Sequence, residues 1–475
     1  MPHYDLFVIG GGPAGSTLAE KASRRGLRVG IAEPRGLGGA CALRGCDPKR
    51  IMVSVTEAAD GVDRLRDHGI ARDAEVDWPA MRRFVREYVD ARPADNAERL
   101  RGAGVAIHEA YATFTGPHAL RLRDARDAHA DGGTGSTDED DATAVTAEHI
   151  VIATGQHPAP LGIDGEAFAK TSAEFHDLEE LPNRVLFIGG GYIGLESAHI
   201  CRRAGAEVTV LHNDDDPLPM FDRDVAQRLL DATRELGIDV HLDREAAAIE
   251  RAGEGAAARF RVSAKDPDGK VHHYDADLVM NTAGRAPTLD GLDLAAAGIE
   301  AGDGGVPVDK YLRVVGSGGK VFAIGDVTAG EGSGPPLTPV AQLDAEAVLA
   351  TITRGRDTAP DFAGVPTAVY TLPELALVGL TRAEAEEKGL DFECSEAFGE
   401  CDRLNAYRVR ARGYGHRVLI ERGTGRILGA QIFGPMASEA INLFALAIRA
   451  GITRDTLRAM PWAYPTWGSD VSAMV

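Results

Sequence analysis

Cys41 and Cys46 are the residues of this chain whose type and spacing point most directly to chemistry, and Gly45 stands beside the second of them. In a regular helix, residues five apart have Cα atoms about 8.6 Å apart, whereas a disulfide needs Cα atoms within about 7 Å. A bond between the two sulfurs therefore requires a distorted turn, for which Gly45 supplies the backbone freedom. A bridge that closes so short a loop adds little stability compared with one that closes a long loop. The pair is better suited to redox chemistry beside an electron donor.

The cysteines follow a complete nucleotide-binding pattern. A buried strand is predicted over residues 4–9, a helix over residues 16–25, and a second strand over residues 28–32 that ends at Glu33. The turn between the first strand and the helix reads G-x-G-x-x-G, with Gly10, Gly12 and Gly15. Such glycines let the backbone approach a pyrophosphate at the positive end of the helix, and an acidic residue such as Glu33 accepts the ribose hydroxyls. The pattern predicts a dinucleotide-binding domain at the start of the chain.

The same pattern recurs near the middle of the chain. A strand is predicted over residues 184–188, and another over residues 207–211 after the intervening helix. The turn between them contains Gly189, Gly191 and Gly194. Two such units imply two bound dinucleotides. With a cysteine pair beside the first, the natural combination is a flavin that passes electrons from a nicotinamide to a disulfide.

The chain resembles the pyridine nucleotide–disulfide oxidoreductases, the family of glutathione reductase, dihydrolipoamide dehydrogenase and mercuric reductase. The resemblance runs nearly end to end and is carried by short motifs in a fixed order: ATG at 153–155, GRAPT at 284–288, VFAIGD at 321–326, LTPVA at 337–341, LPE at 372–374, VGLT at 378–381, LGA at 428–430 and GP at 434–435. It implies an α/β fold with two Rossmann-like dinucleotide-binding domains, for FAD and NAD(P), and a C-terminal α/β dimerisation domain.

Domain boundaries follow from the resemblance and from the sequence pattern. We expect the FAD-binding domain at 1–156 and 282–349, the NAD(P)-binding domain at 157–281, and the dimerisation domain at 350–475. The acidic, Gly/Ser-rich segment 124–143 has no periodicity and is expected to be an exposed hairpin tip.

The resemblance also implies roles for individual residues. Cys46 is expected to be the sulfur nearest the flavin and Cys41 the sulfur that exchanges with substrate. A thiolate in that position, at a helix N-terminus, should have a depressed pKa. Lys49 is expected to pair with Glu196 on the nicotinamide side of the flavin, and Tyr192 to cover the flavin and yield to the nicotinamide.

Further cofactor contacts come from the later motifs. Asp326 is expected to hydrogen-bond the ribityl chain and Thr338 to approach the pyrimidine end of the ring. The other expected cofactor-binding residues are Thr154, Gly155, Arg285 and Gly325. Some family members carry their lysine one position later, where this chain has Arg50.

The residues after the fourth predicted strand bear on the choice of nicotinamide. His212 is followed shortly by three aspartates, residues 214–216, and no arginine occurs until Arg223. Relatives that use NADPH place arginines here to hold the 2′-phosphate, and the aspartates would repel that group. NADH is therefore the favoured donor. A phosphate contact from His212 remains the alternative.

Near the C-terminus the chain departs from the family pattern of His-Pro-Thr followed by a glutamate. Tyr464 stands at the histidine position and Ser469 at the glutamate position, with Asp470 one residue later. A phenol with a pKa of about 10 is a poor base at neutral pH compared with an imidazole near 6.5. Splitting a disulfide requires protonation of a leaving thiolate, so the chain should be a handicapped disulfide reductase. Quinones, dyes, oxygen or soft metal ions would be less affected.

Three functions are therefore considered. The first is an NAD(P)H-dependent FAD enzyme that passes two electrons through Cys41 and Cys46 to a small acceptor, a low-molecular-weight disulfide, a quinone or similar. The second is a mercuric or other metal-ion reductase, because mercuric reductases also carry a tyrosine at the position of Tyr464, although this chain lacks their terminal paired cysteines. The third is a non-catalytic redox-sensing flavoprotein, favoured only by the missing His–Glu pair. No resident metal site is expected.

Composition and charge limit the partners and the cellular location that we expect. A chain of 475 residues should hold several domains, and its net charge of −21 disfavours nucleic acid or an anionic membrane as a partner. Five cysteines without an evident leader, and no long apolar stretch, indicate the cytoplasm. The 51 basic residues are mostly arginine. Abundant Asp and Glu with little Lys suggests a salt-adapted host, and an ordinary acidic bacterial protein is the alternative. A homodimer is expected from the resemblance.

Overall fold

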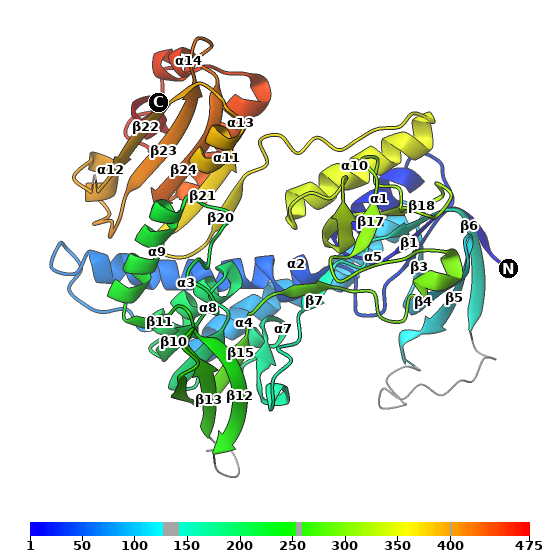
Figure 1. Cartoon of the computed structure of the whole chain (residues 1–475), viewed down its shortest axis with the longest axis horizontal. Helices are drawn as coiled ribbons and strands as arrows, with labels where there is room; N and C mark the ends of the chain where they lie inside the picture. Colours follow the sequence, from blue (N-terminus) through cyan, green and yellow to red (C-terminus); the bar gives the residue numbers. More distant parts are fainter. Residues whose placement is uncertain (127–141, 253–258, 400) are drawn as a thin grey trace. The chain divides into compact units, whose positions relative to one another are not determined.

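The computed structural model describes residues 1–126, 142–252, 259–399 and 401–475. They form two compact units, each described by itself. Unit 1 comprises residues 1–48, 86–159 and 285–362, and unit 2 comprises residues 49–85, 160–284 and 363–475. Both units mix helices with sheets (Figure 1). Most of the segment predicted to be a hairpin tip lies outside the described residues.

Unit 1 is built on a seven-stranded sheet with the order β3-β2-β1-β6-β5-β4 and with β18 paired to β6. Strands β3, β2, β1, β6 and β18 run parallel, whereas β4, β5 and β6 pair antiparallel. The strands of this sheet are β1 (His3–Ile9), β2 (Val29–Ala32), β3 (Ala106–His108), β4 (Ala110–Gly116), β5 (Ala119–Asp124), β6 (Thr143–Ile152) and β18 (Val321–Ala323). Shorter strands are β7 (Gln156–Pro158), β16 (Arg285–Pro287), β17 (Val306–Val308) and β19 (Thr328–Gly330).

The helices of unit 1 are α1 (Pro13–Ser23), α2 (Gly39–Arg44), α5 (Arg92–Gly102) and α10 (Thr338–Arg354), with 3-10 turns η3 (Leu294–Ala297) and η4 (Gly325–Val327). The boundary between the units falls within α3 (Cys46–Arg64) and within α4 (Trp78–Val89). Helices α1 and α10 pack side by side in unit 1 (Figure 1). Pro13 starts α1, where proline is tolerated because the first amide hydrogens of a helix have no intrahelical partner.

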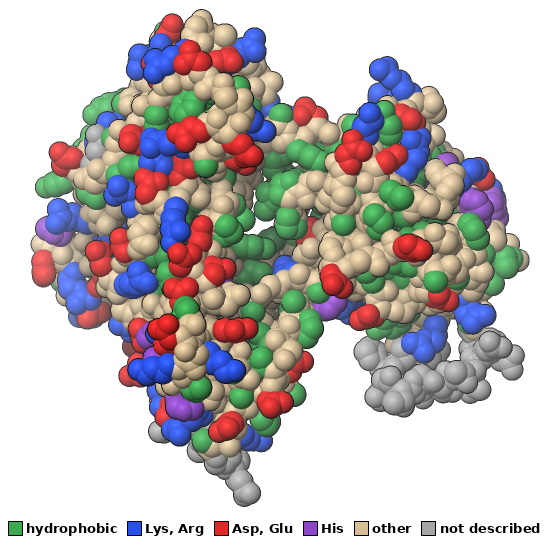
Figure 2. All heavy atoms as spheres, viewed as in Figure 1, with side chains coloured by type: hydrophobic (Ala, Val, Ile, Leu, Met, Phe, Trp, Pro, Cys, Tyr) green, Lys and Arg blue, Asp and Glu red, His purple; other side chains and the backbone are tan. Residues whose placement is uncertain are grey.

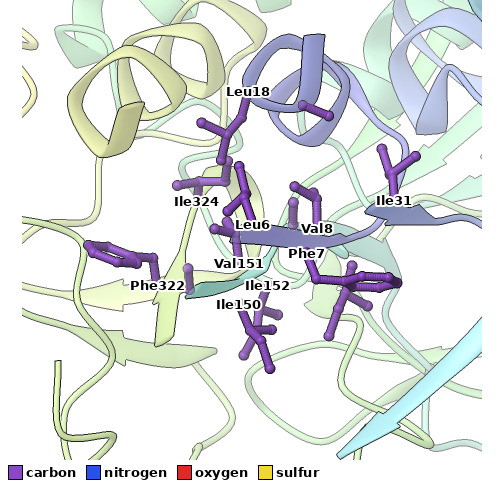
Figure 3. Close-up of a cluster of buried hydrophobic side chains, with 14 of the residues drawn as sticks. Leu6, Phe7, Val8, Leu18, Ile31, Ile150, Val151, Ile152, Phe322 and Ile324 are labelled. Carbon is purple, nitrogen blue, oxygen red and sulfur yellow. The ribbon is translucent and has the colours of Figure 1, made fainter. Parts of the chain in front are cut away.

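The core of unit 1 lies on the central strands. Leu6, Phe7 and Val8 of β1 are fully buried, as are Ile150, Val151 and Ile152 of β6 (Figure 3). Unbroken apolar runs are typical of parallel strands whose sheet is covered on both faces. Leu18 of α1 and Phe322 of β18 also belong to this cluster (Figure 3). The buried apolar strands thus fix the position of the carboxyl end of β1, where the first glycine turn begins.

Unit 2 contains the second nucleotide-binding sheet, which is parallel throughout with the order β11-β10-β9-β15-β8. Its strands are β8 (Lys170–Thr171), β9 (Arg184–Ile188), β10 (Glu207–Leu211), β11 (Ile238–His241) and β15 (Leu278–Asn281). A three-stranded antiparallel sheet consists of β12 (Glu245–Ala252), β13 (Arg259–Lys265) and β14 (Val271–Ala276). The helical elements here are η2 (Glu166–Phe168), α7 (Ser172–Phe175), α8 (Tyr192–Arg203) and α9 (Arg223–Glu235).

The C-terminal part of unit 2 is a five-stranded antiparallel sheet with the order β20-β21-β24-β23-β22, against which α13 packs. The strands are β20 (Thr367–Val369), β21 (Glu374–Gly379), β22 (Phe392–Phe398), β23 (Gly415–Glu421) and β24 (Ile427–Gly434). The helical elements are α11 (Arg382–Glu387), α12 (Leu404–Tyr407), α13 (Ala437–Ala450), α14 (Arg454–Ala459), η5 (Trp467–Asp470) and α15 (Val471–Met474).

The predicted α/β fold class is confirmed, and the predicted strands agree with the observed ones to within a residue at each end. The first helix starts three residues before its predicted start, at Pro13, and ends at Ser23. The three-domain division stays a prediction.

All three tryptophans lie in unit 2. Trp78 is buried, its indole Nε1–H donates to the Leu178 carbonyl at 2.9 Å, and its ring stacks edge-on against Phe175. Trp462 and Trp467 pack partly buried against the C-terminal core.

The exposed surface carries both signs of charge. Asp/Glu and Lys/Arg side chains are interspersed over the face shown in Figure 2. No helix among the described residues combines the length and the apolar composition that crossing a bilayer would need.

The unit 1 core predicts a stability effect. Phe322→Ala should lower the free energy of unfolding by about 3–5 kcal/mol, because it removes a fully buried ring from a packed strand. Denaturant unfolding followed by circular dichroism measures this loss. Val315→Ala, at a side chain that is 56% exposed in the same unit, is the control and should change stability by no more than about 0.5 kcal/mol. A loss below 1 kcal/mol for Phe322→Ala would contradict this packing.

Candidate redox site

The first glycine turn joins β1 to α1, and each of its three glycines answers a different steric demand. Gly10 has a φ of +108°, and a Cβ there would lie 2.3 Å from the Ala153 carbonyl oxygen. A Cβ on Gly15 would lie 2.0 Å from the Gly10 carbonyl oxygen, so only glycine lets α1 start so close to the strand. At Gly12 the nearest atom would be 3.9 Å away, which leaves open space in front of the turn. A pyrophosphate needs this open approach at a helix N-terminus.

Glu33 closes the turn from the neighbouring strand. Its Oε2 accepts a hydrogen bond from the Gly11 amide at 2.8 Å, and its Oε1 accepts one from the Arg35 amide at 2.8 Å. The carboxylate is thereby held at the carboxyl end of β2, where it can accept the hydroxyls of an adenosine ribose.

The second turn, between β9 and α8, repeats this geometry in unit 2. Gly189 has a φ of +106°, and a Cβ on Gly194 would lie 2.1 Å from the Gly189 carbonyl oxygen. A Cβ on Gly191 would meet nothing within 4 Å. The glycine residues of both turns therefore fit dinucleotides.

The cysteine stretch rests directly on the first turn. The Gly38 amide donates to the Gly11 carbonyl at 2.9 Å, and a Cβ on Gly39 would lie 2.7 Å from the Gly12 Cα. Helix α2 then carries Cys41 and ends at Gly45, whose φ of −145° and ψ of −100° interrupt the helix. Helix α3 begins at Cys46. The distorted turn expected between the two cysteines is therefore present at Gly45.

The Cys41 and Cys46 side chains share a hydrogen bond. Thr338, the first residue of α10, donates its hydroxyl to Cys41 Sγ at 3.1 Å. The pKa of Cys41 is raised, first by the hydrogen bond to Cys46 and then by burial, while Thr338 acts in the opposite direction. The expectation of a depressed thiolate pKa therefore does not hold for Cys41.

The raised pKa of Cys41 has a physical reason. When two acidic groups share a hydrogen bond, loss of the first proton leaves a charge on one of them and makes loss of the second proton harder. Cys46 begins a helix of 19 residues, whose N-terminal dipole favours an anion. The start of α3 is therefore a favourable place for a negative charge, whereas the pKa of Cys41 is raised.

Polar residues from the later motifs gather beside the first turn in unit 1. The Thr154 hydroxyl donates to the Thr288 carbonyl at 2.7 Å, next to Gly155, and the Arg285 guanidinium donates to the Gln156 carbonyl at 2.6 Å. Burial raises the pKa of Asp326, and the positive charge of Arg285 opposes that rise.

Asp344 supports this cluster from α10. It is fully buried, and its Oδ2 accepts the Gly325 amide at 2.9 Å. Burial raises the pKa of Asp344 to about 6, and the neighbouring charge of Asp326 contributes to the rise. Its Oδ1 is buried without a hydrogen-bond partner among the described residues.

A second group of expected residues meets in unit 2. Lys49 forms an ion pair with Glu196, whose side chain is buried. The Lys49 Nζ lies 5.5 Å from the centroid of the Tyr192 ring, and Glu196 Oε1 accepts the Tyr370 amide at 2.8 Å. A buried carboxylate needs such a partner, because an unpaired charge in this position would be strongly destabilising.

Arg50 has different partners from Lys49. Its guanidinium lies 4.9 Å from the centroid of the Tyr370 ring and 3.8 Å from both Glu57 and Glu374. The pairing with Glu196 therefore belongs to Lys49 in this chain.

The residues that replace the His–Glu pair lie near the C-terminus of unit 2. The Tyr464 side chain is 77% exposed. Both carboxylate oxygens of Asp470 are engaged, Oδ1 by the Asn405 amide at 2.9 Å and Oδ2 by the Tyr414 hydroxyl at 2.6 Å. The Ser469 hydroxyl donates to the Thr466 carbonyl at 2.6 Å. Asp470 and Ser469 therefore hold the local fold together.

Sequence reasoning missed two contributions to this site. The contact between Thr338 and Cys41 joins residues 297 positions apart, and the local sequence gives no signal for it. Asp344 could have been noticed as an acidic residue in the mostly apolar stretch that follows the LTPVA motif.

In the described part of the chain, no three His, Cys, Asp or Glu side chains are grouped to hold a metal ion.

The fold and the site define a flavoprotein with two dinucleotide-binding domains and a dithiol beside the first. When bound, FAD supplies a ring that takes hydride from a nicotinamide and passes electron pairs to a thiol pair. The chain's own residues provide the open glycine turns, Glu33 for a ribose, and the partly buried Asp326.

Comparisons with known proteins agree with this class. A family model described as pyridine nucleotide-disulphide oxidoreductase matches residues 4–345, and that of its dimerisation domain matches residues 365–475. The chain belongs to the pyridine nucleotide–disulfide oxidoreductase family, and is an FAD-dependent enzyme with NAD(P)H as electron donor.

Relatives differ in the substrate that their names imply. A dihydrolipoyl dehydrogenase of Haloferax volcanii is 32% identical, over 97% of this chain and 93% of that protein. A glutathione reductase of Burkholderia cepacia is 30% identical, over 98% and 96%. The solved structure of the HOCl-induced flavoprotein disulfide reductase RclA from Escherichia coli, a Cu(II) complex, is 25% identical with a TM-score of 0.83 and covers 100% of this chain and 99% of that one. The haloarchaeal relative accords with the acidic composition.

The buried Asp344 predicts a pH-dependent stability. Its raised pKa means that the protonated form favours the folded state, so its contribution is fully present below about pH 4 and is lost as the pH rises through about 6. Asp344→Asn should remove this dependence. Relative to the wild type, the variant should therefore gain about 2–3 kcal/mol more stability at pH 8 than at pH 4. Denaturant unfolding of the holoenzyme at the two pH values tests this, with the exposed Asp303→Asn as control. Equal pH dependence in wild type and Asp344→Asn would contradict the prediction.

Proposed function

We propose that this protein takes two electrons from NADH and passes them through FAD and the Cys41–Cys46 pair to a small acceptor. The observation that carries the proposal is the anchoring of the dithiol on the first dinucleotide turn, with Thr338 donating to Cys41. A short-loop thiol pair in that setting is suited to reversible oxidation.

The thiols divide the work according to their surroundings. Cys46, at the start of α3, carries the negative charge of the reduced pair and later bonds to Cys41 to form the disulfide. When Cys41 attacks the acceptor it passes its proton to the Cys46 thiolate through their shared hydrogen bond, because only a thiolate is nucleophilic, and the Thr338 hydroxyl donates a hydrogen bond to the Cys41 sulfur. With a disulfide acceptor, the Cys41 sulfur bonds one substrate sulfur and releases the other as a thiol. Cys46 then bonds Cys41 and releases the second substrate sulfur, so the two thiols become one disulfide and the acceptor gains two electrons.

Lys49, Glu196 and Tyr192 support the nicotinamide step in this proposal. The Lys49–Glu196 pair provides a cation held by a buried carboxylate, and Tyr192 stands beside it as the movable aromatic cover. A cation near the reactive edge of a flavin favours the reduced, anionic ring.

The choice of acceptor in this proposal rests on Tyr464, which stands at the position of the family's proton-donating histidine. Without an imidazole to protonate the leaving thiolate, a low-molecular-weight disulfide is reduced slowly, and a quinone is the better acceptor. The second candidate is a soft metal ion such as Hg(II) or Cu(II), and the similarity to a reductase solved as a Cu(II) complex favours it. Oxidation of the dithiol to the disulfide supplies one electron to each of two Cu(II) ions.

The assembly in this proposal is a cytoplasmic homodimer. The match to the dimerisation domain supports the dimer. So do exposed apolar side chains in the matched region, namely Leu404, Tyr407, Leu446, Met460 and Tyr464. Five cysteines in a chain of this length suit a reducing compartment.

The thiol role predicts a specific loss. Cys41→Ser should bind FAD and be reduced by NADH, yet lose turnover with the physiological acceptor by at least about 100-fold, because the exchanging sulfur is gone. Anaerobic NADH reduction recorded as a visible spectrum, followed by addition of a disulfide, a quinone or a metal ion, measures both properties. Cys401→Ser is the matched control. Unchanged turnover with every acceptor would overturn the thiol role, and flavin reduction without turnover in the wild type would identify a sensor.

The missing acid–base group predicts that a single substitution can raise the rate of disulfide reduction. Tyr464→His should raise disulfide reduction by at least about tenfold near neutral pH, because an imidazole with a pKa near 6.5 can protonate the leaving thiolate. Quinone reduction should stay the same. Tyr407→His, at another exposed tyrosine of unit 2, is the control. If the disulfide rate does not change, a different step limits the reaction.

A further inference from the structure

Asp47 follows Cys46 directly in the first turn of α3, so a carboxyl group stands beside the thiol pair. Asp47 is partly buried. The pKa of Cys41, raised mainly by the hydrogen bond to Cys46 and by burial, is raised further by the charge of Asp47. The Asp47 carboxyl is therefore close enough to both sulfurs to exchange protons with the groups that react there.

Two side chains from neighbouring helices face the Asp47 carboxyl. The Tyr88 hydroxyl, near the end of α4, donates a hydrogen bond to it, and the positive charge of Arg92, the first residue of α5, acts on it. The Arg92 guanidinium lies 4.4 Å from the centroid of the Tyr88 ring and pairs with Asp95 at 2.8 Å. The carboxyl is thus held by a hydrogen-bond donor that is itself packed against a cation.

Helix α5 also contacts the stretch that leads to the cysteines. The Asn96 side-chain amide donates to the Leu37 carbonyl at 3.2 Å, and a Cβ on Gly36 would lie 3.6 Å from the Pro93 side chain. The start of α5, and with it Arg92, is therefore fixed beside the thiol pair. All these residues belong to unit 1, so the carboxyl, its partners and the thiols form one cluster.

The electrostatics of this cluster favour a protonated Asp47 when the thiol pair is reduced. Burial raises the pKa of Asp47, and the Tyr88 hydrogen bond and the Arg92 charge oppose that rise. A thiolate on the adjacent Cys46 disfavours a second anion. The N-terminal dipole of α3 therefore has two neighbouring acidic groups to stabilise, and it favours one negative charge at a time.

We propose that Asp47 is the acid–base residue of the dithiol, which gives a proton to the leaving sulfur of a disulfide acceptor and regains one when the pair is next reduced. This inference rests on the proposed thiol route and names a proton source for it within a single subunit. The route operates without the imidazole that Tyr464 replaces.

Protons and electrons balance through the cycle. Two electrons and two protons open the disulfide and leave one proton on Cys41, one on Asp47, and Cys46 ionised; the hydride of NADH supplies both electrons and one proton, and solvent supplies the other. Cys41 passes its proton to Cys46 and bonds one substrate sulfur, while the other leaves with the proton of Asp47. Cys46 then gives its proton to Asp47, bonds Cys41 and displaces the second substrate sulfur, which takes that proton. Two thiols leave, and Asp47 ends ionised beside the disulfide.

Two substrates separate proton delivery from thiol exchange. Hydroxyethyl disulfide releases a basic alkyl thiolate that needs a proton, whereas dithiobis(nitrobenzoate) releases an aryl thiolate that is stable without one. Asp47→Asn should lower NADH-dependent turnover of hydroxyethyl disulfide near neutral pH by at least about tenfold, and keep turnover of dithiobis(nitrobenzoate) within about twofold. Asp90→Asn, which removes a 56% exposed carboxylate just after α4, is the matched control and should keep both rates within about twofold.

The pH profile tests the carboxyl itself, through the ratio of the hydroxyethyl disulfide rate to the dithiobis(nitrobenzoate) rate. In the wild type this ratio should fall as Asp47 loses its proton, and in Asp47→Asn it should not change with pH. Tyr88→Phe removes a hydrogen bond that favours the carboxylate, so the pKa of Asp47 rises and the fall should move to higher pH.

The outcomes distinguish the two proposals. Equal effects of Asp47→Asn on the two disulfides, whether none or a common loss, would overturn the role of Asp47 while the thiol route survives. If the wild type reduces neither disulfide in a manner that depends on Cys41, the proposed thiol route fails for disulfide acceptors, and the role of Asp47 fails with it.

Discussion

The close approach of backbone to backbone at the first glycine turn is the constraint on which unit 1 depends. Helix α1 can start against β1 only because Gly15 places no Cβ against the Gly10 carbonyl. The same few atoms receive Glu33 from one side and the stretch that leads to the cysteines from the other. A displacement of α1 would therefore disturb the pyrophosphate approach, the ribose carboxylate and the dithiol together. Unit 2 repeats the contact at Gly194.

The cysteine pair and the Lys49–Glu196 ion pair show two ways in which the protein limits or compensates negative charge. The hydrogen bond to Cys46 raises the pKa of Cys41, so two negative charges on the pair are disfavoured. Lys49 and Glu196 instead cancel each other inside unit 2. The ion pair is costly to disrupt by removing Lys49, because the Glu196 carboxylate would be left buried without compensation.

Local patterns predicted the parts of the fold that local chemistry determines. The strand–turn–helix units, the carboxylate at Glu33 and the interruption at Gly45 each depend on residues that are neighbours in the sequence, and they were predictable from spacing. The hydroxyl of Thr338 on Cys41, the carboxyl of Asp344 under Gly325, and the engagement of Asp470 by Asn405 and Tyr414 depend on contacts between distant segments. Single-sequence reasoning has no access to such contacts. The exposed position of Tyr464 likewise became known only from the structure.

The distribution of tryptophan gives each unit its own optical label. Trp78, Trp462 and Trp467 all lie in unit 2, whereas the glycine turn, Glu33 and Asp326 that fit the flavin lie in unit 1. Indole emission therefore reports the packing of unit 2, whereas isoalloxazine emission reports whether the flavin stays bound to the glycine turn of unit 1. If the two signals change at different denaturant concentrations, the units unfold separately, and the protein cannot be assigned a single two-state free energy.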